Sequence, residues 1–147
     1  MLHFFVQKLL LSPLGFILTK FMSENSMKRN LVKIFSKANP PSDEFIHETW
    51  KLTSENNGIL KLPRLIQYIN ERRVYRERWV KPMMNVVVPL RLINGIEDPI
   101  SGKHMADRFA ELVPHADIVL LQNCGHYPHV ETPEEVLKAF LDFHKLK

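Results

Sequence analysis

The spacing of apolar residues changes near residue 81 of this chain. Over residues 60–80, leucine, isoleucine and tyrosine side chains return every three or four positions, which predicts one long amphipathic helix closed by Lys81-Pro82. Residues 86–93 instead form an unbroken, largely β-branched run, which is typical of a strand buried on both faces. The pattern therefore predicts a helical region over residues 1–81 and an αβ region over residues 82–147.

Capping residues and helix breakers set the other boundaries. Ser42, followed by Asp43 and Glu44, has the pattern of a helix N-cap with acidic residues in the positive first turn. Pro133 stands at the first position of the last expected helix, where proline is favoured. The other expected elements are short helices over residues 4–11, 16–22 and 27–36, helices over 43–54, 102–113 and 132–145, and a second apolar strand over 118–121.

Titratable residues follow both predicted strands. Asp98 lies in the loop after the first strand, and His126 lies in the loop after the second. Because the carboxyl ends of neighbouring parallel strands meet at one edge of a sheet, we expect these two side chains to come together. A carboxylate that fixes the tautomer of a histidine, which then takes a proton from a nucleophile, is the acid–base part of a hydrolase triad. The plainer alternatives are a turn aspartate before Pro99 and an ordinary loop histidine.

These residues belong to stretches that resemble the carboxyl-terminal part of the α/β-hydrolase fold. The general match consists of residues 89–99, Gly125-His126 with Glu131, and the terminal helix. A narrower match is to the mesoderm-specific-transcript-like branch, which is related to epoxide hydrolases and haloalkane dehalogenases. It rests on Gln7-Lys8-Leu9-Leu10, Leu11-Ser12-Pro13, Gln67-Tyr68-Ile69-Asn70-Glu71-Arg72-Arg73, Arg78-Trp79-Val80 and His126-Tyr127-Pro128.

The resemblance implies a partial α/β-hydrolase fold, with a helical lid followed by the last two parallel strands and their helices. The lid corresponds to residues 1–81 and the core part to residues 82–147. On the same resemblance Asp98 matches the acid of the family and His126 its base. Glu131 is expected to order the histidine loop or the start of a helix rather than to react.

The nucleophile motif of this family has no counterpart in the chain. The resemblance places a serine or aspartate nucleophile on a Gly-x-Nuc-x-Gly elbow upstream of the lid, together with the donors of an oxyanion hole. The glycines here are Gly15, Gly58, Gly95, Gly102 and Gly125, and no two of them are four residues apart. We therefore expect a carboxyl-terminal fragment of a hydrolase for a small apolar ester, epoxide or halide. It should act only when an amino-terminal half supplies the nucleophile.

Composition and charge limit the other classes of function. The chain has 147 residues, of which 45% are hydrophobic and 24% charged, as in an ordinary globular protein. The single cysteine, Cys124, excludes a disulfide framework and is compatible with a reducing compartment, so the cytoplasm is the expected location. Residues 1–22 are interrupted by charged residues and a proline, so a docking or amphipathic helix is expected there and membrane association is the lesser alternative.

A second hypothesis rests on the charge of residues 61–81, which hold seven basic and two acidic side chains, a local charge of +5. On this hypothesis the chain is a non-enzymatic helical module that binds an anionic surface or a partner protein. No nucleic-acid motif accompanies these charges, so no nucleic-acid partner is expected.

The hydrolase mechanism requires no organic cofactor or metal, and none is expected. His126 and His129 lack a third ligand for a metal ion. Cys124 adjoins Gly125-His126, but neighbouring side chains on an extended loop usually point apart, which argues against a Cys–His nucleophile. With part of the sheet absent, the chain is expected to expose apolar strand edges and to self-associate.

Overall fold

The computed structural model describes residues 11–12, 15–113 and 115–145, which form two compact units. The first unit comprises Met1–Arg29 and Ser42–Val80, and the second comprises Asn30–Pro41 and Lys81–Lys147. This division differs from the boundary expected near residue 81 in the placement of Asn30–Pro41. The assignment of residues 1–81 to a lid and of residues 82–147 to a hydrolase core remains a prediction.

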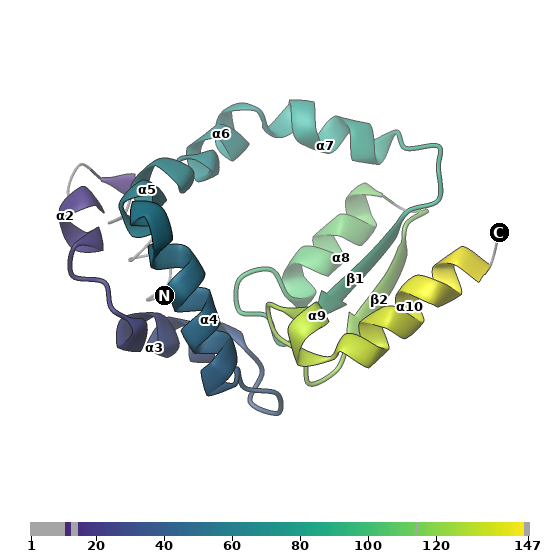
Figure 1. Ribbon diagram of the computed structural model, residues 1–147. Coiled ribbons are helices and arrows are strands. Elements are labelled where there is room, and N and C mark those ends of the chain that lie inside the picture. Colours follow the sequence, from purple (N-terminus) through teal and green to yellow (C-terminus); the bar gives the residue numbers. More distant parts are fainter. Residues whose placement is uncertain (1–10, 13–14, 114, 146–147) are drawn as a thin grey trace. The chain divides into compact units, whose positions relative to one another are not determined.

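The first unit is helical (Figure 1). Its helix α5 (Gly58–Leu65) packs against α2 (Gly15–Thr19) and α4 (Asp43–Ser54). The predicted N-cap is confirmed, because the Ser42 hydroxyl accepts a 3.0 Å hydrogen bond from the amide of Phe45. The turn η1 (Glu55–Asn57) ends α4 with Asn56 and Asn57 in the left-handed region, at φ values of 52° and 58°. Asparagine tolerates this conformation better than most side chains.

The other helices begin or end away from the expected residues. α3 (Glu24–Ile34) begins in the first unit and ends in the second. It replaces the helix expected over residues 27–36, and α2 replaces the one expected over 16–22. Most of the helix expected over residues 4–11 lies outside the described residues.

The prediction of one long helix over residues 60–80 is wrong, because the structure divides this segment into α5, α6 (Tyr68–Val74) and α7 (Arg76–Met84). At the first break, the Gln67 side chain donates a 3.2 Å hydrogen bond to the carbonyl of Pro63. At the second, Tyr75 leaves the helical region, with φ −102° and ψ 20°. Arg72 and Arg76 flank this break with like charges four residues apart, a spacing that disfavours a continuous helix. Pro82 lies inside α7 and does not close it.

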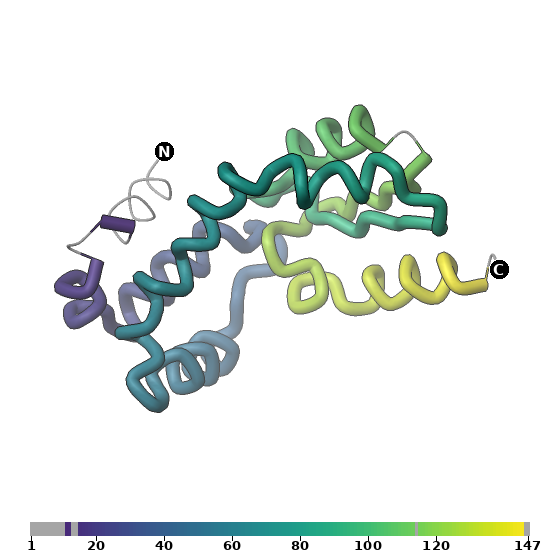
Figure 2. The backbone as a smooth tube through the Cα atoms, turned by 90° about the horizontal axis from the view of Figure 1, so that it is seen from above, coloured from purple at the N-terminus to yellow at the C-terminus, as the bar shows by residue number. Residues whose placement is uncertain are grey.

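The second unit contains a parallel pair of strands, β1 (Arg91–Gly95) and β2 (Asp117–Leu121), in the register Arg91↔Asp117 to Gly95↔Leu121. The connection between them includes α8 (Lys103–Leu112), and β2 is followed by α9 (Pro128–Glu131) and α10 (Pro133–Lys145). The strands lie between α8 and α10 in both views (Figures 1 and 2). This order is that of two parallel strands with their helices, as the sequence predicted.

Arg91 joins the two strands to α10. Its guanidinium group forms an ion pair with Asp117 in the neighbouring strand and donates a 2.6 Å hydrogen bond to the carbonyl of Ala139 in α10. It also lies 5.2 Å from the centre of the Phe143 ring. One partly buried side chain therefore holds a strand edge and a helix together.

The first strand begins later than predicted. The carbonyl of Leu90 accepts a 2.9 Å hydrogen bond from the amide of Asp117, but residues 86–90 lie outside β1 because β2 begins only at Asp117, the partner of Arg91. Val87 is 97% exposed as a result. Neither strand is buried on both faces, because the described part of the sheet has only these two strands.

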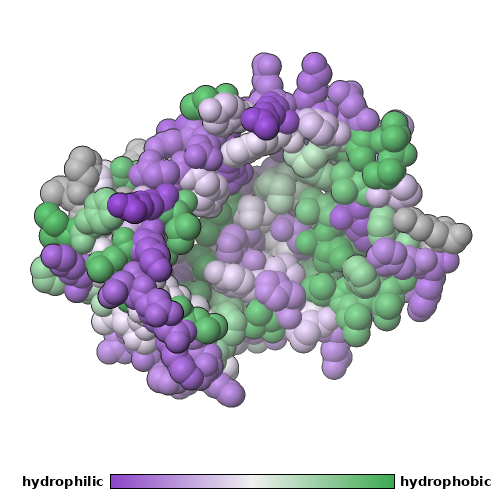
Figure 3. Space-filling model, turned by 45° about the horizontal axis from the view of Figure 1, so that its top comes forward, coloured by the Kyte–Doolittle hydropathy of each residue, from purple (hydrophilic) through white to green (hydrophobic). Residues whose placement is uncertain are grey.

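Several apolar groups of the second unit remain at its surface. Residues 86–90 line a cavity of about 350 Å³ together with Met84, Val113, His115 and Ala116. On α10, Leu137, Phe140 and Leu141 are exposed. Figure 3 shows apolar side chains as green areas of the surface. These apolar groups are therefore accessible at the surface of the described part of the second unit.

Candidate active site

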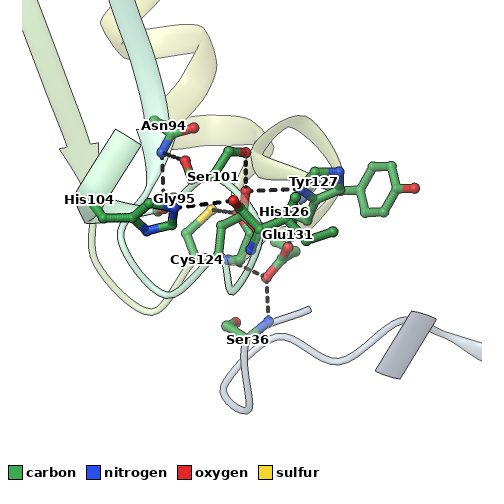
Figure 4. A network of polar contacts seen from close by, with 12 residues as sticks. Ser36, Asn94, Gly95, Ser101, His104, Cys124, His126, Tyr127 and Glu131 are labelled. Carbon is green, nitrogen blue, oxygen red and sulfur yellow. Dashed lines mark hydrogen bonds and ion pairs between the residues drawn. The ribbon is translucent and has the colours of Figure 1, made fainter. Parts of the chain in front are cut away.

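The structure brings Asp98 and His126 together. The Nδ1 atom of His126 lies 2.8 Å from Oδ2 of Asp98, whose side chain is almost completely buried. Asp98 lies in the acid loop (residues 96–102) that follows β1, and His126 lies in the histidine loop (residues 122–127) that follows β2. The strands end side by side at Gly95 and Leu121, so both loops leave the same edge of the sheet, where Figure 4 shows the polar network.

Backbone contacts hold the two loops close to each other. The amide of Ile96 donates to the carbonyl of Leu121 at 3.1 Å, and the amide of Glu97 donates to the carbonyl of Cys124 at 2.9 Å. A Cβ atom at Gly95 would lie 2.1 Å from the carbonyl oxygen of Gly125, closer than any side chain tolerates. Glycine is therefore required here to let the backbones of the two loops approach.

Asp98 is held by two further hydrogen bonds within its own loop. Its Oδ1 accepts from the amide of Ile100 at 2.7 Å, and its Oδ2 accepts from the hydroxyl of Ser101 at 2.6 Å. The side chain of Asn94 donates to the carbonyl of Ser101 at 2.7 Å and so fixes this residue in turn. Burial by itself would raise the pKa of Asp98, but the hydrogen bonds from His126, Ser101 and the Ile100 amide outweigh it and lower the pKa to about 2.

Ser101 was not identified from the sequence. The available signal was its position three residues after an aspartate at the start of a turn, a spacing at which side chain and backbone commonly bond to each other. Its hydroxyl shares Oδ2 of Asp98 with the imidazole of His126. It thus restricts the carboxylate to the rotamer that faces the histidine.

His126 has the surroundings expected of a general base. The hydrogen bond with Asp98 raises the pKa of its imidazole, while burial acts in the opposite direction. With Nδ1–H donating to a carboxylate, Nε2 is the nitrogen that can accept a proton. The ring of Tyr127 lies edge-on to the imidazole at 5.1 Å.

The other candidate groups do not form a second reactive centre. Cys124 is completely buried, burial raises the pKa of its thiol, and Thr132 Oγ1 lies 3.5 Å from its sulfur atom, so it is a packing residue and not an exposed thiolate. Among the described residues, no group of three histidine, cysteine or acidic side chains is arranged to hold a metal ion. No helix in the described ranges is long and apolar enough to cross a membrane.

Comparison with known proteins identifies the architecture around this pair. The chain is 34% identical over 136 residues to LipZ of Mycobacterium tuberculosis, a hydrolase by name, covering 92% of this chain and 47% of LipZ. It is 32% identical over 145 residues to the mesoderm-specific transcript protein of Mus musculus, covering 94% of this chain and 42% of that protein. No protein-family model matches the chain.

Two solved hydrolases share its fold at lower sequence identity. The serine hydrolase CarC, involved in carbazole degradation, superposes with a TM-score of 0.65 at 19% identity, over 85% of this chain and 48% of its own. The epoxide hydrolase CorEH gives a TM-score of 0.65 at 20% identity, over 89% and 45%. The chain has the carboxyl-terminal part of the α/β-hydrolase fold, as predicted. It spans about half the length of the curated relatives it matches.

Within this α/β-hydrolase part, the two candidate residues occupy loops at the carboxyl ends of neighbouring parallel strands, where open α/β sheets bind their ligands. The sequence contains no Gly-x-Ser-x-Gly or Gly-x-Asp-x-Gly elbow. The hydrolase part described by the structure therefore carries an acid–histidine pair without the family's nucleophile motif.

Proposed function

We propose that this chain supplies the acid–base pair of a hydrolase active site, in which His126 is the general base and Asp98 orients it. The observation that carries the proposal is the 2.8 Å contact between Nδ1 of His126 and a buried carboxylate, at the adjoining ends of two parallel strands. The proposed substrates are small apolar esters, epoxides or halides.

The proposed chemistry follows from the tautomer. Asp98 holds the proton of His126 on Nδ1, so that Nε2 is free to take a proton from a serine hydroxyl, or from the water that attacks an ester formed on an aspartate. The carboxylate then stabilises the imidazolium that results. This mechanism needs no organic cofactor and no metal ion.

The proposed activity depends on a nucleophile from another segment. Each missing oxyanion donor typically lowers the rate by about 10²–10³-fold, and the activated attack is lost as well. We propose that a nucleophile-bearing half pairs with the free edge of β1 and covers the apolar surface formed by residues 86–90 and by Leu137, Phe140 and Leu141 of α10. When that half is absent, the same surface is available for self-association.

A pair of activity assays tests the proposal. The chain alone should hydrolyse p-nitrophenyl butyrate no faster than its His126→Ala variant. A chimera that places the amino-terminal half of LipZ before residue 1 should hydrolyse the ester, and His126→Ala should abolish this activity. His126-dependent turnover by the chain alone would contradict the need for a second segment. A chimera whose activity survives His126→Ala would contradict the role of His126.

A second candidate function is supported by the exposure of the basic residues in 61–81. All seven lie at the surface, and none of them has an ion pair among the described residues; they are Lys61, Arg64, Arg72, Arg73, Arg76, Arg78 and Lys81. Unpaired arginines near exposed Tyr75 and Trp79 suit an anionic surface. Salt-sensitive co-sedimentation with phosphatidylserine vesicles, reduced by Arg72→Gln with Arg76→Gln, would support this function, and equal binding to neutral vesicles would contradict it.

A further inference from the structure

Glu131 is a buried carboxylate that accepts hydrogen bonds from three backbone amides. Its Oε2 accepts hydrogen bonds from the amides of Ser36 at 2.8 Å and Gly125 at 2.7 Å, and its Oε1 accepts from the amide of Tyr127 at 3.0 Å. The residue is 8% exposed. Figure 4 shows it between the histidine loop and the backbone of Ser36. Two of its three donors are the immediate neighbours of His126.

The third donor belongs to a segment distant in sequence, residues 34–39, which we name the docked segment. The amide of His126 itself donates to the carbonyl of Ile34 at 2.9 Å. The hydroxyl of Ser36 and the side-chain amide of Asn39 both donate to the carbonyl of Asn123, at 2.7 and 2.8 Å. The docked segment therefore contacts the histidine loop at two further points, Asn123 and His126, besides its hydrogen bond with Glu131.

Close backbone approach accompanies these hydrogen bonds. A Cβ atom at Gly125 would lie 2.5 Å from the carbonyl oxygen of Ile34 and 2.7 Å from the nitrogen of Ser36. Phe35 is 6% exposed, and its ring lies 5.2 Å from that of Tyr127. The docked segment and the histidine loop thus form one packed layer, and Glu131 provides its central charge.

A buried carboxylate is costly unless hydrogen bonds compensate for the lost water. Here amides of both the docked segment and the histidine loop provide that compensation, so the carboxylate is satisfied only when the two segments are in their observed places. Charged hydrogen bonds of this type are stronger than neutral ones and more demanding in geometry. Glu131 therefore favours a single arrangement of the backbone on either side of His126.

We propose that Glu131 is a positioning residue for His126, which acts by fastening the histidine loop to the docked segment and so keeps the imidazole within hydrogen-bond distance of Asp98. The inference rests on the proposed function of His126 as the base. In the sequence, the docked segment links the two parts of the first unit, Met1–Arg29 and Ser42–Val80. The position of the base thus depends on a segment that lies outside the two strands and their loops.

Three variants of the full chain separate positioning from charge. Glu131→Asp keeps the charge but shortens the side chain by one methylene, so it cannot reach all three amides. Glu131→Gln keeps the shape but removes the charge, which by itself helps to raise the pKa of His126. Glu134→Gln, at an exposed position in the first turn of α10, is the matched control.

The readouts are the pKa of His126, from NMR titration, and hydrogen exchange at the amides of Ser36 and His126. We expect Glu131→Asp to bring the pKa back toward 6.5 and to speed exchange at both amides by about tenfold to a hundredfold, as for loss of a charged hydrogen bond. Glu134→Gln should change neither. If Glu131→Asp leaves the pKa and the exchange rates as in the unsubstituted chain, the positioning role is wrong.

A milder variant keeps the test decisive if Glu131→Asp does not fold. Asn39→Ala removes one hydrogen bond of the docked segment and leaves Glu131, Asp98 and His126 in place. It should speed exchange at the Ser36 and His126 amides by a few-fold, about the effect of one neutral hydrogen bond, and unchanged exchange would overturn the inference. Failure of the proposed function looks different, because the ester hydrolysis of the chimera would then survive His126→Ala whatever the exchange rates in the Glu131 variants.

Discussion

The hydrogen bond between Asp98 and His126 should make the stability of the second unit depend on pH in a defined window. Asp98→Asn is the perturbation that removes this dependence while nearly preserving the shape of the side chain. In the variant, an amide nitrogen takes the place of one carboxylate oxygen and faces either the hydroxyl of Ser101 and Nδ1 of His126 or the amide of Ile100. An amide nitrogen that faces the Ile100 amide opposes another donor, whereas one that faces His126 requires Nδ1 to accept and so moves the imidazole proton to Nε2.

The size of the effect follows from the pKa of Asp98, which falls from 3.8 to about 2 in the folded chain. At about 1.4 kcal/mol for each pKa unit, the ionised carboxyl contributes about 2 kcal/mol to the free energy of unfolding. Because the folded pKa is lowered, this contribution is present above pH 3.8 and is lost as the pH falls toward 2. The raised pKa of His126 adds stability that is present below 6.5 and is lost as the pH rises through the folded value.

Urea unfolding, followed by circular dichroism below, within and above the window from pH 3.8 to 6.5, measures the effect. The unsubstituted chain should be most stable inside the window, and Asp98→Asn should flatten both flanks. Asp142→Asn, which changes a half-exposed carboxylate of α10, is the matched control and should leave the profile unchanged. An acid flank in Asp98→Asn as steep as that of the unsubstituted chain would refute the reasoning.

Three other substitutions test the surrounding contacts. Ser101→Ala should raise the pKa of Asp98 above about 2, because it removes a hydrogen bond to Oδ2, and an unchanged carboxyl ¹³C NMR titration would contradict this. Gly125→Ala should destabilise the chain by about 1–3 kcal/mol in urea unfolding, because its methyl group would overlap the backbone at Ile34; a loss below about 0.5 kcal/mol would mean that the docked segment is not packed as described. Arg91→Lys should lower the free energy of unfolding by about 1–2 kcal/mol, because it loses the forked contact with Asp117 and Ala139. Arg108→Lys, at an exposed ion pair, should have little effect, and equal losses in the two variants would contradict the role of Arg91.

The sequence was most informative where a local rule determines the structure. Ser42 with its acidic neighbours predicted a capped helix start, which the structure has. Two apolar strands separated by a helical stretch predicted parallel pairing, and parallel pairing brings the loops that contain Asp98 and His126 to one edge. The contact between these residues follows from topology, which explains how a short sequence pattern located it.

Contacts between distant segments were not predictable in the same way. The docked segment contacts Glu131 through the backbone amide of Ser36, 95 residues away in sequence. Because every residue except proline carries such an amide, the residue type at this position does not indicate the contact. The break at Tyr75 was missed because the apolar spacing of residues 60–80 suits one continuous helix, whereas the like charges of Arg72 and Arg76 oppose it. The start of β1 was missed because its length depends on where the partner strand begins.

The most direct test of the central claim is the ¹⁵N NMR spectrum of the His126 imidazole, recorded with and without Asp98→Asn. The account predicts that neutral His126 carries its proton on Nδ1, that its pKa lies above 6.5, and that both properties are lost in the variant. A neutral imidazole protonated on Nε2 in the unsubstituted chain, with a pKa that Asp98→Asn does not change, would contradict it.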